Sequence, residues 1–402
     1  MPEIRTLHDP AELLAAATLF RQAMFGLPGG VTPVDGWAER YVVPGRVYAA
    51  SLDGQLAGTS NSFPGELTLP GGQRVPHAAV THVGVLPHFS RRGVLRALFS
   101  QQLADLYRQG VAVATLRASQ GTIYGRFGFG IATAIQDLRI DKRELPSLPA
   151  AEGDIRLLPA ANAWEAQQAI VARFPHPHAG TLARWPQWWA LQQHRLAHSN
   201  LNHYVALALK DGEAQGFVRY HAKPDDNWLY STERTLVVDD LHAADPQLAA
   251  QLLGYLLQLD IARYIELPHR PVDDPLPLLL ANPRAVQQTG RIDESWLRII
   301  NVEQTLNARR YASGEAVTLA IDDPLLAENH GVWRLSSDGI QRSASRPDIT
   351  LGVDALAMLL LGEYTAQQLA AARRLQPHHS QAAARLTCLL ACHEHPWSGI
   401  FF

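Results

Sequence analysis

Hydrophobic residues alternate between strand-like and helix-like spacing in the first third of the chain. They dominate residues 78–86 and 111–118, and between these runs they recur every three to four positions over 94–107. Pro87 predicts the end of the first run, and Gly110 predicts the end of the helix. The pattern therefore predicts a strand, a polar loop, a helix and a second strand, in that order.

The polar loop is basic and ends in a glycine. Arg91, Arg92 and Gly93 lie where the helix is predicted to begin. A helix N-terminus carries unpaired N–H groups and partial positive charge, glycine lets the backbone approach an anion, and arginine adds forked donors. Neither a Walker loop nor a dinucleotide-binding glycine fingerprint is present. The loop predicts a pyrophosphate site, with a solvent-exposed basic helix start as the alternative.

A weak internal repeat follows the first unit. Residues 205–217 match 47–59 in their apolar positions, and each segment turns at an Asp-Gly pair, which predicts a β-hairpin. A second copy of the same fold is the favoured interpretation, and two unrelated hairpins are the alternative. Asp239 and Asp240 stand near the place where the second copy would need cations. Because carboxylates repel a pyrophosphate, this copy is expected not to bind the cofactor.

Proline-rich stretches predict the domain boundaries. Pro146 and Pro149 lie in a linker-like segment, and five prolines lie within 268–283. Beyond them, strands followed by helices predict an α+β unit. The predicted domains are 1–145, 146–290 and 291–402, and the fold class is α+β, with two related domains followed by a third.

Composition excludes several classes of protein. The 402 residues have a net charge of −3, 47% hydrophobic and 18% charged residues, which is typical of a soluble globular chain and not of a nucleic-acid or membrane-surface protein. Two cysteines cannot form a disulfide framework, so a reducing cytoplasm is expected. No apolar run approaches the length that spans a bilayer, and no membrane partner is expected.

Two motifs carry a resemblance to a known family. The Arg-Arg-Gly-Val sequence at the helix start and IYGRFGFG over 123–130 resemble the GNAT acetyltransferases, and 349–371 resembles a sterol-carrier-protein-like domain. Two GNAT copies followed by such a domain resemble the enhanced intracellular survival (Eis) acetyltransferases. The resemblance implies acetyl-CoA as co-substrate, an amine of a small molecule such as an aminoglycoside-like antibiotic as acceptor, and a homo-oligomer, a hexamer.

The resemblance also implies roles for individual residues. Tyr124 stands where the family has its general acid, and the C-terminal carboxylate of Phe402 would be the base. Ser90 and Leu95 depart from the family's loop motif. If a β-bulge splays the strand, its N–H groups would hold the thioester, and Gly84 would ease the distortion. The expected cofactor-binding residues are Val83, Gly84, Val85, Arg91, Arg92, Gly93, Val94, Leu95, Arg96, Ser119 and Gln120.

The acceptor site is less well defined by the sequence. The expected substrate-binding residues are Trp37, Asp35, Glu39, Arg117, Asp293 and Phe401, with Glu294 a further acidic candidate. A cation at 117 and an apolar residue at 401 predict a pocket less acidic than those that take polycations. Protein lysines remain an alternative acceptor, and a non-enzymatic lipid or small-molecule binder is an alternative function.

Two rival sites are considered. His82 on the central strand is a candidate base, although a structural histidine is the favoured interpretation. Cys388, Cys392, His393 and His395 superficially resemble metal ligands. Their spacing lacks the paired C-x-x-C arrangement of zinc sites, so no metal is expected.

Overall fold

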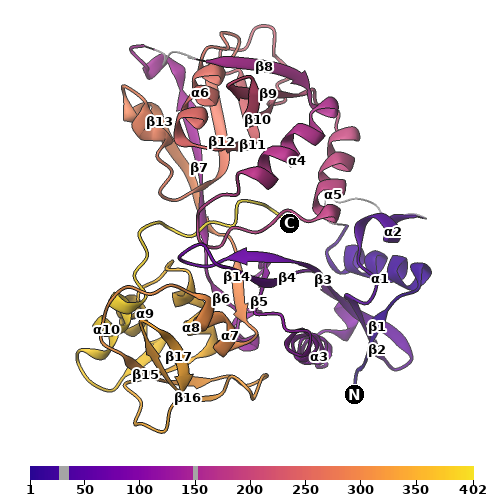
Figure 1. Cartoon of the computed structure of the whole chain (residues 1–402). Coiled ribbons are helices and arrows are strands. Elements are labelled where there is room, and N and C mark those ends of the chain that lie inside the picture. Colours follow the sequence, from indigo (N-terminus) through magenta and orange to yellow (C-terminus); the bar gives the residue numbers. More distant parts are fainter. Residues whose placement is uncertain (27–35, 148–152) are drawn as a thin grey trace. The chain divides into compact units, whose positions relative to one another are not determined.

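The computed structural model describes residues 1–26, 36–147 and 153–402, and the chain divides into two compact units (Figure 1). Unit 1 comprises Met1–Ala134, Pro177–Leu191 and Asp293–Phe402. Unit 2 comprises Ile135–His176 and Gln192–Ile292. The candidate site described below lies within unit 1.

The first sheet of unit 1 has seven strands in the order β1-β2-β3-β4-β5-β14-β6. Its strands are β1 (Glu3–Leu7), β2 (Val47–Leu52), β3 (Gln55–Thr68), β4 (Arg74–Val85), β5 (Val113–Leu116), β14 (Trp296–Ile299) and β6 (Gly130–Ile131). Its helices are α1 (Pro10–Ala23), α2 (Trp37–Tyr41) and α3 (Val94–Arg108). The predicted strand, helix and strand over 78–118 are therefore confirmed as β4, α3 and β5.

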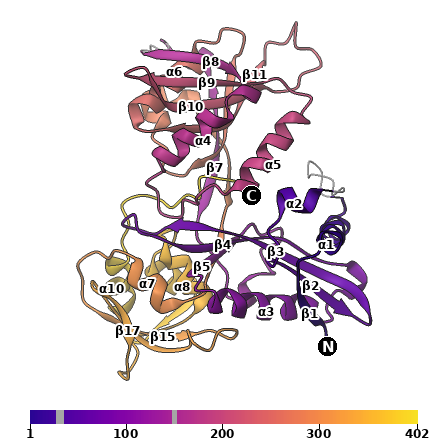
Figure 2. The ribbon, with the colours of Figure 1, turned by 45° about the vertical axis from the view of Figure 1, so that its right-hand side comes forward.

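Alternation along β2 sets the two faces of this sheet. Val47 and Ala49 pack with α1 and α2, whereas Tyr48 and Ala50 pack with the start of α3. In Figure 2, α1 and α2 lie on one side of this sheet and α3 lies on the other. Successive side chains of a strand point to opposite faces, so one strand supplies both apolar layers. The helices thus cover the sheet on both sides.

The sheet opens in the middle of β4. Thr59 of β3 faces Gly84, whereas Asn61 faces Thr81. Ser60, the one residue between Thr59 and Asn61, therefore opposes two residues of β4, and the extra residue forms a bulge in β4. His82 lies in this bulge with φ 49°, and β4 pairs with β5 only near its beginning, at His77–Ala79. The bulge expected from the sequence is present.

A smaller sheet completes unit 1, in the order β17-β16-β15-β18-β19. Its strands are β15 (Val317–Asp322), β16 (Gly331–Ser336), β17 (Gly339–Arg342), β18 (Ile349–Gly352) and β19 (Leu375–Pro377), and its helices are α7 (Val302–Ala308), α8 (Val353–Leu360), α9 (Ala366–Ala371) and α10 (Ala382–Leu389). Helix α8 packs against β14 and β6 of the first sheet.

Unit 2 repeats the arrangement of the first sheet. Its strand order is β13-β7-β12-β11-β10-β9-β8. Hairpin β9–β10 turns at Asp211-Gly212, as β2–β3 turns at Asp53-Gly54, and all four residues have positive φ. Like β4 and β5, strands β11 and β12 are parallel neighbours joined by a helix. The predicted second copy is confirmed.

The elements of unit 2 are as follows. The strands are β7 (Ala134–Asp141), β8 (Asp154–Pro159), β9 (His203–Lys210), β10 (Glu213–Ala222), β11 (Thr235–Ala243), β12 (Tyr264–Pro271) and β13 (Val286–Asp293), and the helices are α4 (Trp164–Arg173) and α6 (Pro246–Leu257). Helix α5 (Pro186–Ala197) begins in unit 1 and continues into unit 2 after Leu191.

Two strands lie in sheets other than those implied by the predicted boundaries after 145 and 290. Strand β7 precedes the first boundary but pairs with β12 in the second sheet. Strand β14 follows the second boundary but pairs with β5 and β6 in the first sheet (orange in Figure 1). The physical reason is that prolines mark where strands end, but they carry no information on which sheet a strand joins.

Candidate active site

A cleft of about 800 Å³ lies between the bulged end of β4, the start of α3 and the loop that follows β5. Except for Arg92, every residue expected to bind the cofactor lines it, and so does Tyr124. The departures Ser90 and Leu95 also line this cleft. The structure therefore gathers the predicted anion-binding loop and the predicted acid around one cavity.

The start of α3 presents its backbone to this cleft. Gly93 is the N-cap residue with φ 83°, a conformation that favours glycine, and a Cβ there would touch no protein atom. Arg91 also has positive φ, at 63°. The first residues of the helix line the cavity, so unpaired N–H groups and partial positive charge are available to an anion.

The two arginines of the loop have different surroundings. Arg91 lines the cleft, whereas Arg92 Nη2 lies 2.7 Å from Asp53 Oδ2 and its guanidinium lies over the Phe89 ring. From the sequence, both residues are expected to bind the pyrophosphate. The structure favours Arg91 for it, because an approaching phosphate would have to compete with Asp53 for Arg92.

Tyr124 is buried at the wall of the cleft. Its ring packs edge-on against Phe99 and Phe129, with centroids 6.0 and 6.1 Å away. Burial raises the pKa of Tyr124, and a hydrogen bond with Ser119 partly offsets this shift. The phenol is therefore protonated at neutral pH and able to donate.

The loop that carries Tyr124 is held by a buried ion pair. Arg298 Nε donates to the Phe127 carbonyl at 2.9 Å, and Arg298 Nη2 contacts both carboxylate oxygens of Asp323 at 2.6 and 2.8 Å. Both side chains are fully buried. A Cβ on Gly130 would lie 2.2 Å from the Asp354 carbonyl of α8, which explains a glycine of the IYGRFGFG motif. Sequence reasoning missed Arg298 and Asp323, which no local motif marks.

The last residues of the chain are packed into unit 1. Trp397 and Ser398 are buried, and Trp188 Nε1 donates to the Phe401 carbonyl at 2.8 Å. The Phe402 ring packs edge-on against Trp185, with centroids 5.4 Å apart. Hydrogen bonds and aromatic contacts therefore hold the C-terminal segment in place.

Arg117 and Glu294 form the polar centre of this tail. Arg117 donates to Glu294 Oε1 at 3.1 Å, to Ser398 Oγ at 2.9 Å and to the Ile400 carbonyl. Glu294 also accepts from the backbone N–H and hydroxyl of Ser398, at 3.0 and 2.6 Å. Burial lowers the pKa of Arg117 to about 9, opposed by Asp293, so the guanidinium stays charged at neutral pH. Sequence reasoning did not single out Ser398.

The expected substrate-binding residues fall into separate places. Arg117 and Phe401 belong to the tail, with the guanidinium 5.2 Å from the Phe401 ring centroid. Trp37 is buried on α2 beside the His82 ring, and Glu39 is exposed on the same helix. The Asp293 carboxylate accepts a hydrogen bond from Trp296 Nε1 at 2.5 Å. Asp35 lies outside the described residues. None of the five expected substrate-binding residues that the structure describes lines the 800 Å³ cleft.

The rival sites receive less support. His82 Nδ1 lies 3.4 Å from Asn61 Nδ2, and its ring lies against Phe20. Cys388 is exposed, and Cys392 Sγ contacts Arg309 at 3.3 Å. Over residues 1–26, 36–147 and 153–402, one group of three side chains is close enough to share a metal, and it contains neither cysteine. In the same ranges no helix combines the length and the apolar character needed to cross a bilayer.

Comparison with known proteins defines the class. Acetyltransferase (GNAT) domain models match residues 3–132 and 180–299, and a Sterol carrier protein domain model matches residues 302–399. An uncharacterized N-acetyltransferase of Streptomyces avermitilis is 33% identical over 353 residues, covering 85% of each chain. The chain is thus an N-acetyltransferase of the GNAT type, and the non-enzymatic alternative is set aside.

Two further relatives identify the family. N-acetyltransferase Eis of Mycobacterium tuberculosis is 32% identical over 382 residues, covering 90% of each chain. The crystal structure of Eis1 from Mycobacterium abscessus has a TM-score of 0.92 and 41% identity, with full coverage of both chains. The chain belongs to the Eis family of N-acetyltransferases, as the sequence motifs and domain order predicted.

Proposed function

We propose that this protein transfers the acetyl group of acetyl-CoA to an amine of a small molecule, with Tyr124 as general acid and the carboxylate of Phe402 as general base. One observation carries the proposal. The anion-binding features of Arg91 and the α3 start line the same cleft as the buried phenol of Tyr124. A diphosphate and a thioester sulfur of one molecule would then reach the two ends of that cleft.

The cleft suits acetyl-CoA, which GNAT acetyltransferases use as co-substrate. The pyrophosphate would accept from the N–H groups at the α3 start and pair with the Arg91 guanidinium. Beyond Ala79, β4 and β5 are no longer paired in register, which leaves a gap in the sheet for the thioester arm. The backbone of Val83–Val85 would polarise the acetyl carbonyl.

The chemical step needs one acid and one base. The amine nitrogen attacks the acetyl carbon and loses a proton to the Phe402 carboxylate, while the carbon–sulfur bond breaks and the thiolate takes the proton of Tyr124. That phenol is protonated at neutral pH, and burial raises its pKa further. The polar contacts of Ser398 and Ile400 with Arg117 support a fixed tail end, which a base requires.

The surroundings of the tail favour an acceptor with an apolar or aromatic part. Trp185, Phe401 and Phe402 supply aromatic surface, and the carboxylate of Glu294 is neutralised by Arg117. A polycation such as an aminoglycoside would gain little from a carboxylate that is already paired. We therefore propose a singly charged amine. The family further supports a cytoplasmic homo-oligomer, a hexamer, which light scattering would measure.

The test is an acetyl-CoA consumption assay over a panel of apolar amines, aminoglycosides and lysine peptides. Turnover is expected with the apolar amines, and preference for peptides would overturn the small-molecule assignment. Tyr124→Phe is expected to lower kcat about 10²- to 10⁴-fold, while the control Tyr230→Phe, at an exposed tyrosine, keeps wild-type turnover. A glycine added after Phe402 moves the carboxylate, and full activity in that variant would remove it from the mechanism.

A further inference from the structure

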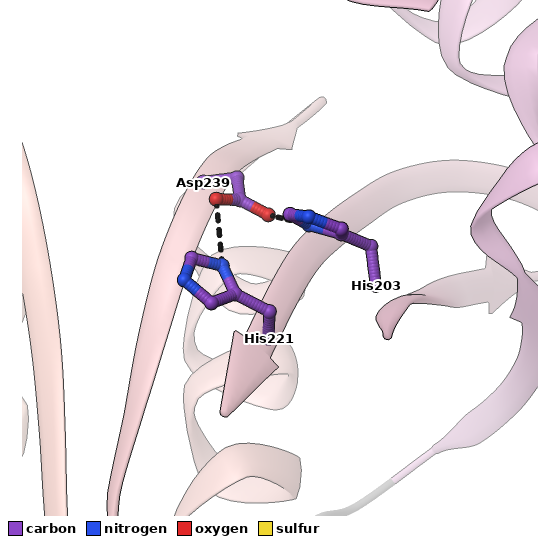
Figure 3. A group of neighbouring side chains, drawn as sticks. All are labelled: His203, His221 and Asp239. Carbon is purple, nitrogen blue, oxygen red and sulfur yellow. Dashed lines mark hydrogen bonds and ion pairs between the residues drawn. The ribbon is translucent and has the colours of Figure 1, made fainter. Parts of the chain in front are cut away.

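Three side chains of unit 2 converge from neighbouring strands, outside the proposed active site. His203 of β9, His221 of β10 and Asp239 of β11 face one another (Figure 3). His203 Nδ1 lies 2.8 Å from Asp239 Oδ2, and His221 Nδ1 lies 2.9 Å from Asp239 Oδ1. Each carboxylate oxygen therefore serves one imidazole.

The topology of the sheet brings these residues together. His203 and His221 are directly opposed on β9 and β10. Between β10 and β11 the register shifts, because Arg219 faces Asp240 whereas Tyr220 faces Val238, so Asp239 is the extra residue of a bulge. A bulge re-aims a side chain, and here it turns a carboxylate toward the two rings. The first sheet bulges on the corresponding strand, at His82.

Each contact between a ring and the carboxylate needs a proton or a metal ion between the two atoms. The Asp239 carboxylate places one oxygen within hydrogen-bond distance of each imidazole. Its oxygens are acceptors, and a neutral imidazole nitrogen without a proton is also an acceptor. A proton or a metal ion must therefore lie on each nitrogen–oxygen contact.

The second ring nitrogen of His203, Nε2, has a hydrogen-bond partner of its own. Ser199 Oγ lies 3.2 Å from His203 Nε2 and accepts from the Leu201 N–H at 3.1 Å. When Nε2 carries the proton and donates to this hydroxyl, Nδ1 is left with a lone pair directed at the carboxylate. Histidines that bind metals commonly have their other ring nitrogen held in this way.

We propose that His203 Nδ1, His221 Nδ1 and the Asp239 carboxylate bind one divalent transition-metal ion of the zinc type. Two imidazoles and a carboxylate are typical zinc donors, whereas calcium and magnesium prefer oxygen alone. The donor atoms lie within 4.8 Å of one another, so modest side-chain movement would bring each to about 2.1 Å from a shared ion.

The surroundings allow a metal ion to reach the three side chains and allow its positive charge to be neutralised. The three side chains are 12–20% exposed, which leaves room for water as a fourth ligand. The nearest fixed cation, Arg219, is 3.9 Å from Asp239 Oδ2 and donates to Gln167 at 3.0 Å. The carboxylate of Asp240 follows on the same strand. Bound metal would tie β9, β10 and β11 together.

The test is calorimetric titration of the full-length protein with zinc chloride after treatment with a chelator. We expect one equivalent of zinc to bind, with affinity at least about tenfold weaker in Asp239→Asn and in His221→Gln. The matched control is His198→Gln. It removes one ring of the stacked His194–His198 pair, which could take up zinc by itself, and should leave the affinity unchanged.

Cobalt substitution provides a second readout on the wild-type protein, which matters if a variant fails to fold. Visible absorption typical of four-coordinate Co²⁺, lost on adding zinc, is the expected result. The proposal is overturned if the wild-type protein binds zinc no more tightly than Asp239→Asn, or if His198→Gln abolishes binding. In the first case, protons bridge the contacts. In the second case, zinc binds at the surface pair.

Discussion

The guanidinium of Arg117 lies 3.1 Å from the carboxylate of Glu294, and both groups bind the C-terminal segment. Arg117 directly follows β5, and Glu294 lies two residues before β14, the neighbour of β5 in the sheet. Their side chains are only 14% and 2% exposed. The pair therefore joins the ends of β5 and β14 in the first sheet to the tail that ends at Phe402.

Replacing Arg117 with Met should release the tail while leaving the cofactor cleft intact. Because Arg117 does not line that cleft, KM for acetyl-CoA should change little, whereas kcat should fall on the order of 100-fold as the proposed base, the Phe402 carboxylate, loses its position. Steady-state kinetics with both substrates varied separate the two parameters. Arg5→Met, which breaks an exposed pair with Glu12, is the control and should behave as wild type.

Glu294→Gln tests the charge of the same pair. The amide can still accept from Ser398, but the positive charge of Arg117 is no longer balanced. A cation near the Phe402 carboxylate stabilises its ionised form, so the acid limb of kcat/KM should move to lower pH. Asp293, His178 and Arg184 are further charged or titratable groups near the tail. An unchanged pH profile would contradict a carboxylate base beside Arg117.

Features of the site that lie close together in sequence were predictable, and those that depend on distant partners were not. The anion-binding loop follows from a strand, a glycine and a helix that are consecutive in the chain, because local backbone geometry fixes their relation. Glu294 and Ser398 are 104 residues apart, and only packing brings them together. The entry of β14 into the first sheet has no signal in its four residues.

Arg91 and Arg92 also show the effect of a distant partner, because only the structure reveals that Arg92 pairs with Asp53. Arg91→Gln should raise KM for acetyl-CoA about tenfold or more, because a charge-assisted hydrogen bond to phosphate contributes about 1.5–3 kcal/mol. Arg92→Gln should change it less than about threefold, since Asp53 already occupies that guanidinium. The two variants differ by one position and carry the same charge change, so each controls for the other. Equal effects would mean that Arg92 leaves Asp53 when the cofactor binds.

Asp323→Asn should destabilise unit 1 strongly. The substitution leaves the Arg298 guanidinium, which is fully buried, without its carboxylate, and breaking such a pair costs about 3–5 kcal/mol. Urea unfolding followed by tryptophan fluorescence measures the change. Arg385→Met, which removes a more exposed pair with Glu315, should stay within about 1 kcal/mol of wild type. Because Arg298 also holds the Phe127 carbonyl, the folded fraction of Asp323→Asn should show lower kcat.

His77 should make the stability of unit 1 depend on pH. The ring is fully buried between β4 and β5, where Nε2 lies 2.8 Å from Thr115 Oγ1, and burial lowers the pKa of His77 to about 3. The unfolded chain, with an ordinary histidine pKa near 6.5, binds the proton first, so stability is lost as pH falls from about 6.5 toward 3. Between pH 7 and 4.5 this one group should lower the free energy of unfolding by about 2–3 kcal/mol.

Urea titrations at both pH values should show the loss in wild type and in His8→Gln, an exposed control, but not in His77→Gln. A pH dependence that survives in His77→Gln would assign the acid sensitivity to other groups.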